Sequence, residues 1–201
     1  MIAELGRRVK EEGLNILCVP SSYQAMMEAL QAGLKLTDLY EHHQLDLTLD
    51  GADEVDSSLN LTKGGGAALA REKILASASK RYIIVVDEGK LVEKLGLRKP
   101  IPVEVLPFAA PMVKARLEEK YGRVEFREGS GKLGPTVTDN GNFILDVYTG
   151  PLEKPEKFEV EVKRMPGVVE VGIFTGLADE VYVGCRDGSV RRIRRAGGEA
   201  I

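Results

Sequence analysis

The fold is decided by LDLTLDGADEVDSSLNLTKGGGAALAREKILASASKRYIIVV, which occupies residues 45–86. Its two ends, LDLTL (45–49) and YIIVV (82–86), are apolar runs typical of buried strands, and AALAREKILASAS (67–79) has apolar residues at helical spacing. Outward toward the N-terminus, the sequence predicts a helix stopped by Gly13, a buried strand over 15–19 and a helix ended by Gly33. This alternation predicts an α/β fold with a parallel sheet.

The pattern changes after Pro100, where the chain becomes proline-rich and extended. A helix over about 112–121, an extended run over 124–127 and a glycine-rich turn, GSGKLG (129–134), follow. DNGN (139–142) between TVT and FILDVYT is a hairpin signal, and a second helix over about 156–164 and strand-like VVEVGIF come after it. EVYVGCRDGSVRRI (180–193) then predicts a hairpin that returns to the first sheet. We therefore expect a main α/β domain (1–103 and 175–201) and a small α+β insert (104–174) on an antiparallel sheet.

Composition bounds the function. The 201 residues are 43% hydrophobic and 29% charged, as in an ordinary globular protein, and the net charge of −3 predicts no general attraction to nucleic acid. No apolar run is long enough to span a membrane. Cys18 and Cys185 form no CxxC pair, which favours a reducing cytoplasm, and adjacent His42 and His43 argue against a histidine metal site.

The loop over residues 50–66, DGADEVDSSLNLTKGGG, begins where a predicted strand ends and stops where a predicted helix begins. Ligands of open α/β sheets bind beyond the carboxyl ends of strands. Gly64, Gly65 and Gly66 allow a close approach of the backbone to a ligand, and the following helix N-terminus and Lys63 suit an anion or a developing oxyanion. The alternative is a solvated acidic loop with a flexible glycine stretch.

Glu72 lies six positions after Gly66, in the second turn of the predicted helix, and could face back toward the loop as a general base. The alternative is a surface ion pair with Arg71 or Lys73.

Three further residues follow predicted strands. Lys90 could bind an anionic group or be a solvated lysine at a helix start. Ser21 and Ser22 could bind phosphate or hydroxyl groups, or cap the next helix.

Six segments together resemble ribose-5-phosphate isomerase of type A over nearly the whole chain. These segments are LDGADEVD, LTKGGGAALAREKI, IIVVDEGK, PIPVEVLP, TDNGNFILD and PGVVEVGIF. The resemblance implies a Rossmann-like catalytic domain with a small α+β lid, interconversion of ribose 5-phosphate and ribulose 5-phosphate through an enediolate, no metal or organic cofactor, and a homodimer or homotetramer.

The resemblance also implies roles for individual residues. Glu72 corresponds to the catalytic base, Lys63 with the glycine backbone would stabilise the enediolate oxygen, and Lys90 would contact substrate. In the DGAD motif, Asp50 and Asp53 would contact the sugar and assist ring opening or transfer of a hydroxyl proton, so that Asp50 joins Glu72 and Lys63 as a catalytic residue. Gly51 and Ala52 lie between the two aspartates in the same substrate-binding segment.

One departure concerns the N-terminus. Members of the family carry a strand and a GTGST-like phosphate loop upstream of the helix that begins here at Met1, and no such segment occurs elsewhere in the sequence. Either the start of the sequence is misassigned, or the sequence is a piece of a longer protein, or the protein is a genuine short form. In the last case we expect an incomplete phosphate site, weak substrate affinity and an exposed sheet edge or apolar patch.

Alternative functions are a non-catalytic sugar-phosphate sensor, an acyl-CoA transferase-like enzyme with a glutamate nucleophile, and an inactive chain or subunit partner. A sensor would not be expected to keep the base, lysine and aspartates together.

Overall fold

The centre of the protein is a four-stranded sheet in the order β13-β12-β6-β3. The computed structural model describes residues 1–129, 131 and 133–195. Strands β3 (Thr48–Asp50), β6 (Tyr82–Asp87) and β12 (Glu180–Gly184) are parallel, and β13 (Val190–Arg194) is antiparallel to β12. Helix α3 (Leu69–Ala78) packs against one face through an apolar core that includes residues of both. The predicted parallel sheet, and the return of the chain to it, are confirmed.

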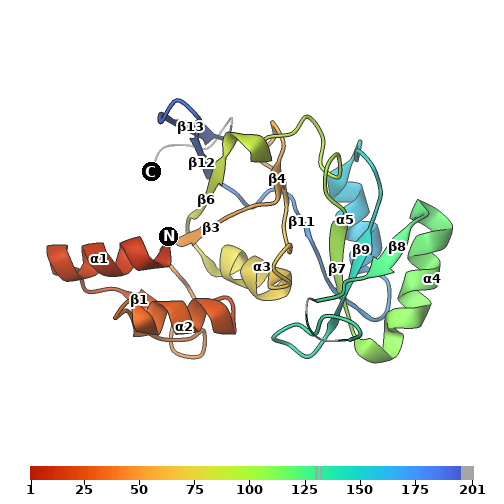
Figure 1. The fold of residues 1–201 in the computed structure, drawn as a ribbon, viewed down its shortest axis with the longest axis horizontal. Helices are drawn as coiled ribbons and strands as arrows, with labels where there is room; N and C mark the ends of the chain where they lie inside the picture. Colours follow the sequence, from red (N-terminus) through yellow and green to blue (C-terminus); the bar gives the residue numbers. More distant parts are fainter. Residues whose placement is uncertain (130, 132, 196–201) are drawn as a thin grey trace.

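The N-terminal segment forms a separate group at one end of the molecule (Figure 1). Helix α1 (Ile2–Glu12) ends at Gly13 as predicted, and α2 (Tyr23–Gln31) follows. The prediction of a buried strand over 15–19 is wrong. Only β1 (Leu17–Cys18) forms, it pairs with the unpredicted β2 (Lys35–Leu36) outside the central sheet, and Leu17 is 51% exposed. An apolar run specifies no partner, and a two-residue ladder buries little of either face.

A second sheet lies at the opposite end of the molecule, beside helices α4 and α5 (Figure 1). Its order is β10-β7-β9-β8, and all its pairings are antiparallel, as expected for the segment after Pro100. The elements of this part are β7 (Ile101–Val105), the 3₁₀ turn η2 (Pro107–Ala109), α4 (Ala110–Tyr121), β8 (Val124–Phe126), β9 (Phe143–Val147), α5 (Pro155–Lys163) and β10 (Val168–Val171).

No helix among the described residues is both long and apolar enough to cross a bilayer.

The predicted hairpin around DNGN is only partly correct. The turn exists, with the Thr138 amide donating to the Asn142 carbonyl at 2.8 Å, but TVT forms no strand and makes one isolated bridge, Val137 to Phe143. The Thr138 hydroxyl and Asn142 side-chain amide instead donate to the buried Glu104 carboxylate, which turns the segment into a capped loop. The predicted glycine-rich turn over 129–134 includes positions 130 and 132, which lie outside the described residues.

A third, three-stranded sheet joins the acidic loop to the rest of the fold and was not predicted. Strands β4 (Glu54–Val55) and β5 (Leu61–Thr62) form a hairpin within the loop, and β5 also pairs with β11 (Ile173–Phe174). Gly172 lies just before β11, where the Lys63 amide donates to its carbonyl at 2.8 Å. A Cβ on Gly172 would lie 2.4 Å from the Lys63 carbonyl oxygen, so the two chains approach too closely for a side chain.

The replacement Gly172→Ala should destabilise the protein by about 3 kcal/mol, because backbone on both sides of the new methyl group cannot move aside freely. Urea unfolding followed by circular dichroism measures the loss. Gly184→Ala is the matched control, since its Cβ would meet only the Val86 carbonyl oxygen at 3.8 Å. Equal midpoints for the two variants would contradict the proposed close approach.

Candidate active site

Three charged side chains from separate elements meet at one buried point. The Lys63 Nζ atom lies 3.0 Å from Asp50 Oδ2 and 3.2 Å from Glu72 Oε2, and donates to the Gly51 carbonyl at 2.7 Å. Lys63 is only 4% exposed, while the carboxylate side chains are 18% and 16% exposed. The structure therefore brings together the three residues that the resemblance assigns to catalysis.

The secondary structure explains this convergence. Asp50 is the last residue of β3, at the carboxyl end of a parallel strand, and Lys63 directly follows β5. Because α3 begins at Leu69, Glu72 lies in its first turn, one turn earlier than predicted. The alternative of a surface ion pair for Glu72 with Arg71 or Lys73 is wrong, since Glu72 pairs with Lys63 instead.

The cluster changes the acidity of its members. Burial raises the pKa of Glu72 to about 6, with nearby Asp50 acting in the same direction and Lys63 opposing both. Burial works against the charge on Lys63, but the carboxylates of Asp50 and Glu72 outweigh it and raise the pKa of that ammonium group. A carboxylate that titrates close to neutrality beside a fixed positive charge is suited to accept and return a proton.

Asp50 is held by more than the lysine. The buried Tyr82 hydroxyl donates to Asp50 Oδ2 at 3.0 Å, and the Gly51 amide donates to Oδ1 at 2.7 Å. Sequence reasoning missed Tyr82 because it was counted as one more apolar residue of the YIIVV strand. A tyrosine in a buried strand needs a partner for its hydroxyl group, and that was the available signal.

The glycine loop, defined as Gly64–Gly66, lies beside this cluster. The Gly65 amide donates to Asp53 Oδ2 at 2.8 Å, and a Cβ on Gly65 would lie 2.6 Å from Asp53 Oδ1. Gly64 has a φ of 99°, a conformation that favours glycine. No side chain caps the N-terminus of the following helix α3. Asp53 thus holds the loop, and contact between Asp53 and a sugar remains a prediction.

The remaining sequence candidates lie apart from these contacts. Lys90 ends the 3₁₀ turn η1 (Glu88–Lys90) after β6, and Ser22 caps α2 by accepting from the Ala25 amide at 3.0 Å. Among the described residues, no hydrogen bond or ion pair joins Lys90, Ser21 or Ser22 to Lys63. Ala52 is partly buried against the core of the central sheet. No group of three His, Cys, Asp or Glu residues in the described parts of the chain could hold a metal ion.

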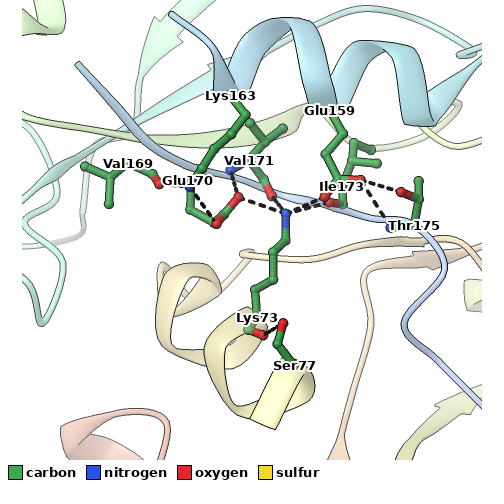
Figure 2. A network of polar contacts seen from close by, with 9 residues as sticks. All are labelled: Lys73, Ser77, Glu159, Lys163, Val169, Glu170, Val171, Ile173 and Thr175. Atoms are coloured by element: carbon green, nitrogen blue, oxygen red, sulfur yellow. Dashed lines mark hydrogen bonds and ion pairs between the residues drawn. The ribbon is translucent and has the colours of Figure 1, made fainter. Parts of the chain in front are cut away.

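Helix α3 is fixed in place by Lys73, the neighbour of Glu72 (Figure 2). The Lys73 ammonium donates to Glu159 Oε1 at 2.7 Å, to Glu170 Oε1 at 2.9 Å, and to the carbonyls of Val171 and Ile173. These partners come from α5, β10 and β11. Lys73 therefore ties the helix that carries Glu72 to the antiparallel part of the fold.

Comparison with known proteins assigns the chain to a family. The family model described as ribose 5-phosphate isomerase A (phosphoriboisomerase A) matches residues 17–188. The chain belongs to this family. It is 52% identical to ribose-5-phosphate isomerase A of Methanothermobacter thermautotrophicus, over 93% of this chain and 82% of that protein. It is 46% identical to human ribose-5-phosphate isomerase, over 94% of this chain and 62% of the human protein.

Solved structures of the family share the fold. The isomerase A structure from Methanocaldococcus jannaschii is 43% identical and superposes with a TM-score of 0.91, over 96% of this chain and 84% of that one. A D-ribose-5-phosphate isomerase in complex with phospho-erythronic acid is 41% identical, with a TM-score of 0.92, over 96% and 85% of the two chains. The mixed α/β fold of the isomerase family is thus common to all three.

Replacing Lys73 with Met should destabilise the protein by about 3–5 kcal/mol, because the carboxylates of Glu159 and Glu170 would stay buried after losing this cation. Urea unfolding provides the measurement. Lys80→Met is the matched control, since Lys80 pairs with Asp46 at the surface and should contribute less than about 1 kcal/mol. Similar losses of unfolding free energy in the two variants would show that Lys73 does not fix helix α3 in place.

The raised pKa of Glu72 can be measured directly. We expect one side-chain carboxyl carbon to titrate with a midpoint near pH 6 in ¹³C NMR spectra of glutamate-labelled protein, and that transition to be missing from Glu72→Gln. Glu72 is then mainly protonated below this pH and mainly ionised above it. A Glu72 midpoint at or below pH 4.5 would contradict the effect of burial.

Proposed function

We propose that this chain interconverts D-ribose 5-phosphate and D-ribulose 5-phosphate through an enediolate, a reaction of the non-oxidative pentose phosphate pathway. The observation that carries the proposal is the buried cluster of Lys63 with Asp50 and Glu72 beside the glycine loop. Membership of a family whose relatives are named ribose-5-phosphate isomerase supports it. Those names do not favour a non-catalytic sugar-phosphate sensor.

Glu72 is the proposed base. Its ionised carboxylate takes the C2 proton of the open-chain aldose, the C–H electron pair forms the C1–C2 double bond, and the C1 carbonyl oxygen gains the negative charge. The ketose forms when the O2 hydroxyl has lost its proton, an O2 electron pair forms the C2 carbonyl, and the C1–C2 double-bond pair takes the proton back from Glu72 at C1. Asp50, held by Tyr82 and Lys63, is placed to carry the hydroxyl proton between O2 and O1.

Lys63 and the glycine loop are the proposed stabilisers of the enediolate. The Lys63 ammonium carries a positive charge beside the proposed base, and this charge would attract a developing negative charge on the substrate oxygen. Amide groups of Gly64, Gly65 and Gly66, ahead of the uncapped α3, add dipoles of the same sign.

The rest of the proposed substrate site lies along the same loop and after the neighbouring strand. Gly51, Ala52 and Asp53 continue the loop from Asp50, and Lys90 follows the neighbouring strand β6. A relative bound to phospho-erythronic acid supports a sugar phosphate as ligand. The proposed substrate-binding residues are Asp50, Gly51, Ala52, Asp53, Lys63, Gly64, Gly65, Gly66, Lys90, Ser21 and Ser22.

The insert and the assembly are also proposals. Residues 104–174 would act as a lid or oligomerisation domain on the catalytic part (1–103 and 175–201), because α5 and β10 already contact α3 through Lys73. We propose that the chain forms a homodimer or homotetramer. Light scattering of the purified chain would measure the mass of this assembly in solution. The free thiols of Cys18 and Cys185 support a cytoplasmic location.

The replacement Glu72→Gln tests the function. Removing the base should lower kcat for ribose 5-phosphate by a factor of about 10³ or more while KM changes little, because the amide keeps the shape of the carboxylate. Conversion to ribulose 5-phosphate is followed directly. The matched control is Glu119→Gln, an exposed position on α4 that should leave kcat unchanged. Retained turnover in Glu72→Gln would overturn the assignment of the base.

A further inference from the structure

Arg127, directly after β8, reaches from the antiparallel sheet to the glycine loop. Its Nη1 group donates to the carbonyl oxygen of Gly64 and, at 3.1 Å, to that of Gly65. Asp146 on β9 holds the same guanidinium from the other side, accepting from Nε at 2.9 Å and from Nη2. Both charged side chains are largely buried, at 16% and 13% exposure. A bidentate ion pair with a carboxylate fixes the plane of the guanidinium group, and it therefore fixes the direction of the remaining N–H donors.

Holding these two carbonyls sets the direction of the next two amides. A trans peptide unit is planar, and its C=O and N–H bonds point in opposite directions. The Gly64 carbonyl faces Arg127, and the Gly65 amide of the same unit faces Asp53 on the other side. By the same geometry, the Gly65 carbonyl on Arg127 directs the Gly66 amide away from Arg127.

The Gly64–Gly65 peptide has restraints of its own, because Asp53 accepts from the Gly65 amide and the Ala67 amide donates to the Gly64 carbonyl at 3.0 Å. Neither contact holds the next peptide, Gly65–Gly66. Glycine populates both signs of φ almost equally, so consecutive glycine peptides can rotate at little cost. A rotated Gly65–Gly66 unit would present a carbonyl oxygen where an amide is needed, and would repel an oxyanion. A positive charge on the carbonyl side also polarises the peptide and strengthens its N–H as a donor.

We propose that Arg127, held by Asp146, is a positioning residue that fixes the Gly65–Gly66 peptide plane so that the Gly66 amide can stabilise the oxyanion of the reaction. This role rests on the proposed isomerase function. Arg127 acts through the backbone of the loop and need not touch the substrate, so its loss should affect the reacting state more than the bound ground state.

Arg127→Ala and Arg127→Lys test the role, with Arg123→Ala as matched control. Arg123 also pairs with a carboxylate of the same sheet, Glu125 at 2.8 Å, and is not among the donors to the glycine loop. We expect kcat for ribose 5-phosphate to fall at least about tenfold in both Arg127 variants, with KM changed less than about threefold. An ammonium group lacks the planar fork that binds Asp146 bidentately and fixes the direction of the donors toward the two carbonyls. Millimolar methylguanidinium should restore part of the kcat of Arg127→Ala, as a purely structural defect would not allow.

A kcat within twofold of the unmodified protein in either Arg127 variant, a loss confined to KM, or a lack of rescue by methylguanidinium would overturn the proposal. If Arg127→Ala does not fold, Arg127→Lys decides by the same criterion.

Amide hydrogen exchange of Gly65 and Gly66, measured by NMR, separates this inference from the proposed function. Exchange should accelerate in Arg127→Lys and stay unchanged in Arg123→Ala, whether or not the chain turns over ribose 5-phosphate. An inactive unmodified chain would count against the isomerase function alone. Unchanged amide exchange at Gly65 and Gly66 in Arg127→Lys would overturn the proposal that Arg127 fixes the glycine loop.

Discussion

The site depends on a single buried cation placed between two carboxylates. At 4% exposure, burial without a partner would favour the neutral form of the Lys63 side chain. Burial without a nearby cation would likewise favour protonated carboxyl groups. Lys63 with Asp50 and Glu72 avoids both outcomes by pairing, but one positive charge cannot fully satisfy two negative ones. Burial, together with the charge of Asp50, raises the pKa of Glu72 to about 6 while Lys63 stays charged. The proposed base and a cation thus lie within hydrogen-bonding distance of each other.

The surrounding fold fixes the positions of these charged residues through three contacts that each involve a backbone carbonyl. Gly172 brings the antiparallel sheet against the Lys63 backbone, Lys73 fixes α3, and Arg127 grips the glycine loop. All three contacts join the insert to the loop and helix that carry the site. The antiparallel sheet is therefore a structural part of the site as well as a neighbouring layer.

Much of this could be predicted from the sequence because local patterns determine local structure. Gly13 marked the end of α1, YIIVV marked the central strand β6, and the order of elements predicted the parallel sheet. Pairing between short segments could not be predicted in the same way. The β4–β5 hairpin has two residues in each strand, and nothing in the sequence near Leu17 identifies Lys35 as its partner.

The candidate site was predicted to a similar extent. Glu72, Lys63 and Asp50 stood out as charged residues around a glycine stretch, and they do converge. Tyr82 and Arg127 could not be picked out from the sequence, because each lies in a segment whose residue pattern is explained by a strand alone. Their roles come from neighbours far along the chain, Asp50 for Tyr82 and Gly64 for Arg127, which no local pattern contains.

The Lys73 network has a consequence for how the protein is made. The four oxygens around its ammonium belong to residues 86 to 100 positions later in the chain. A nascent chain that has emerged only as far as α4 has no partner from this set for that buried charge. The contacts of Lys73 that fix the helix carrying Glu72 can therefore form only after residues 159–173 have been synthesised.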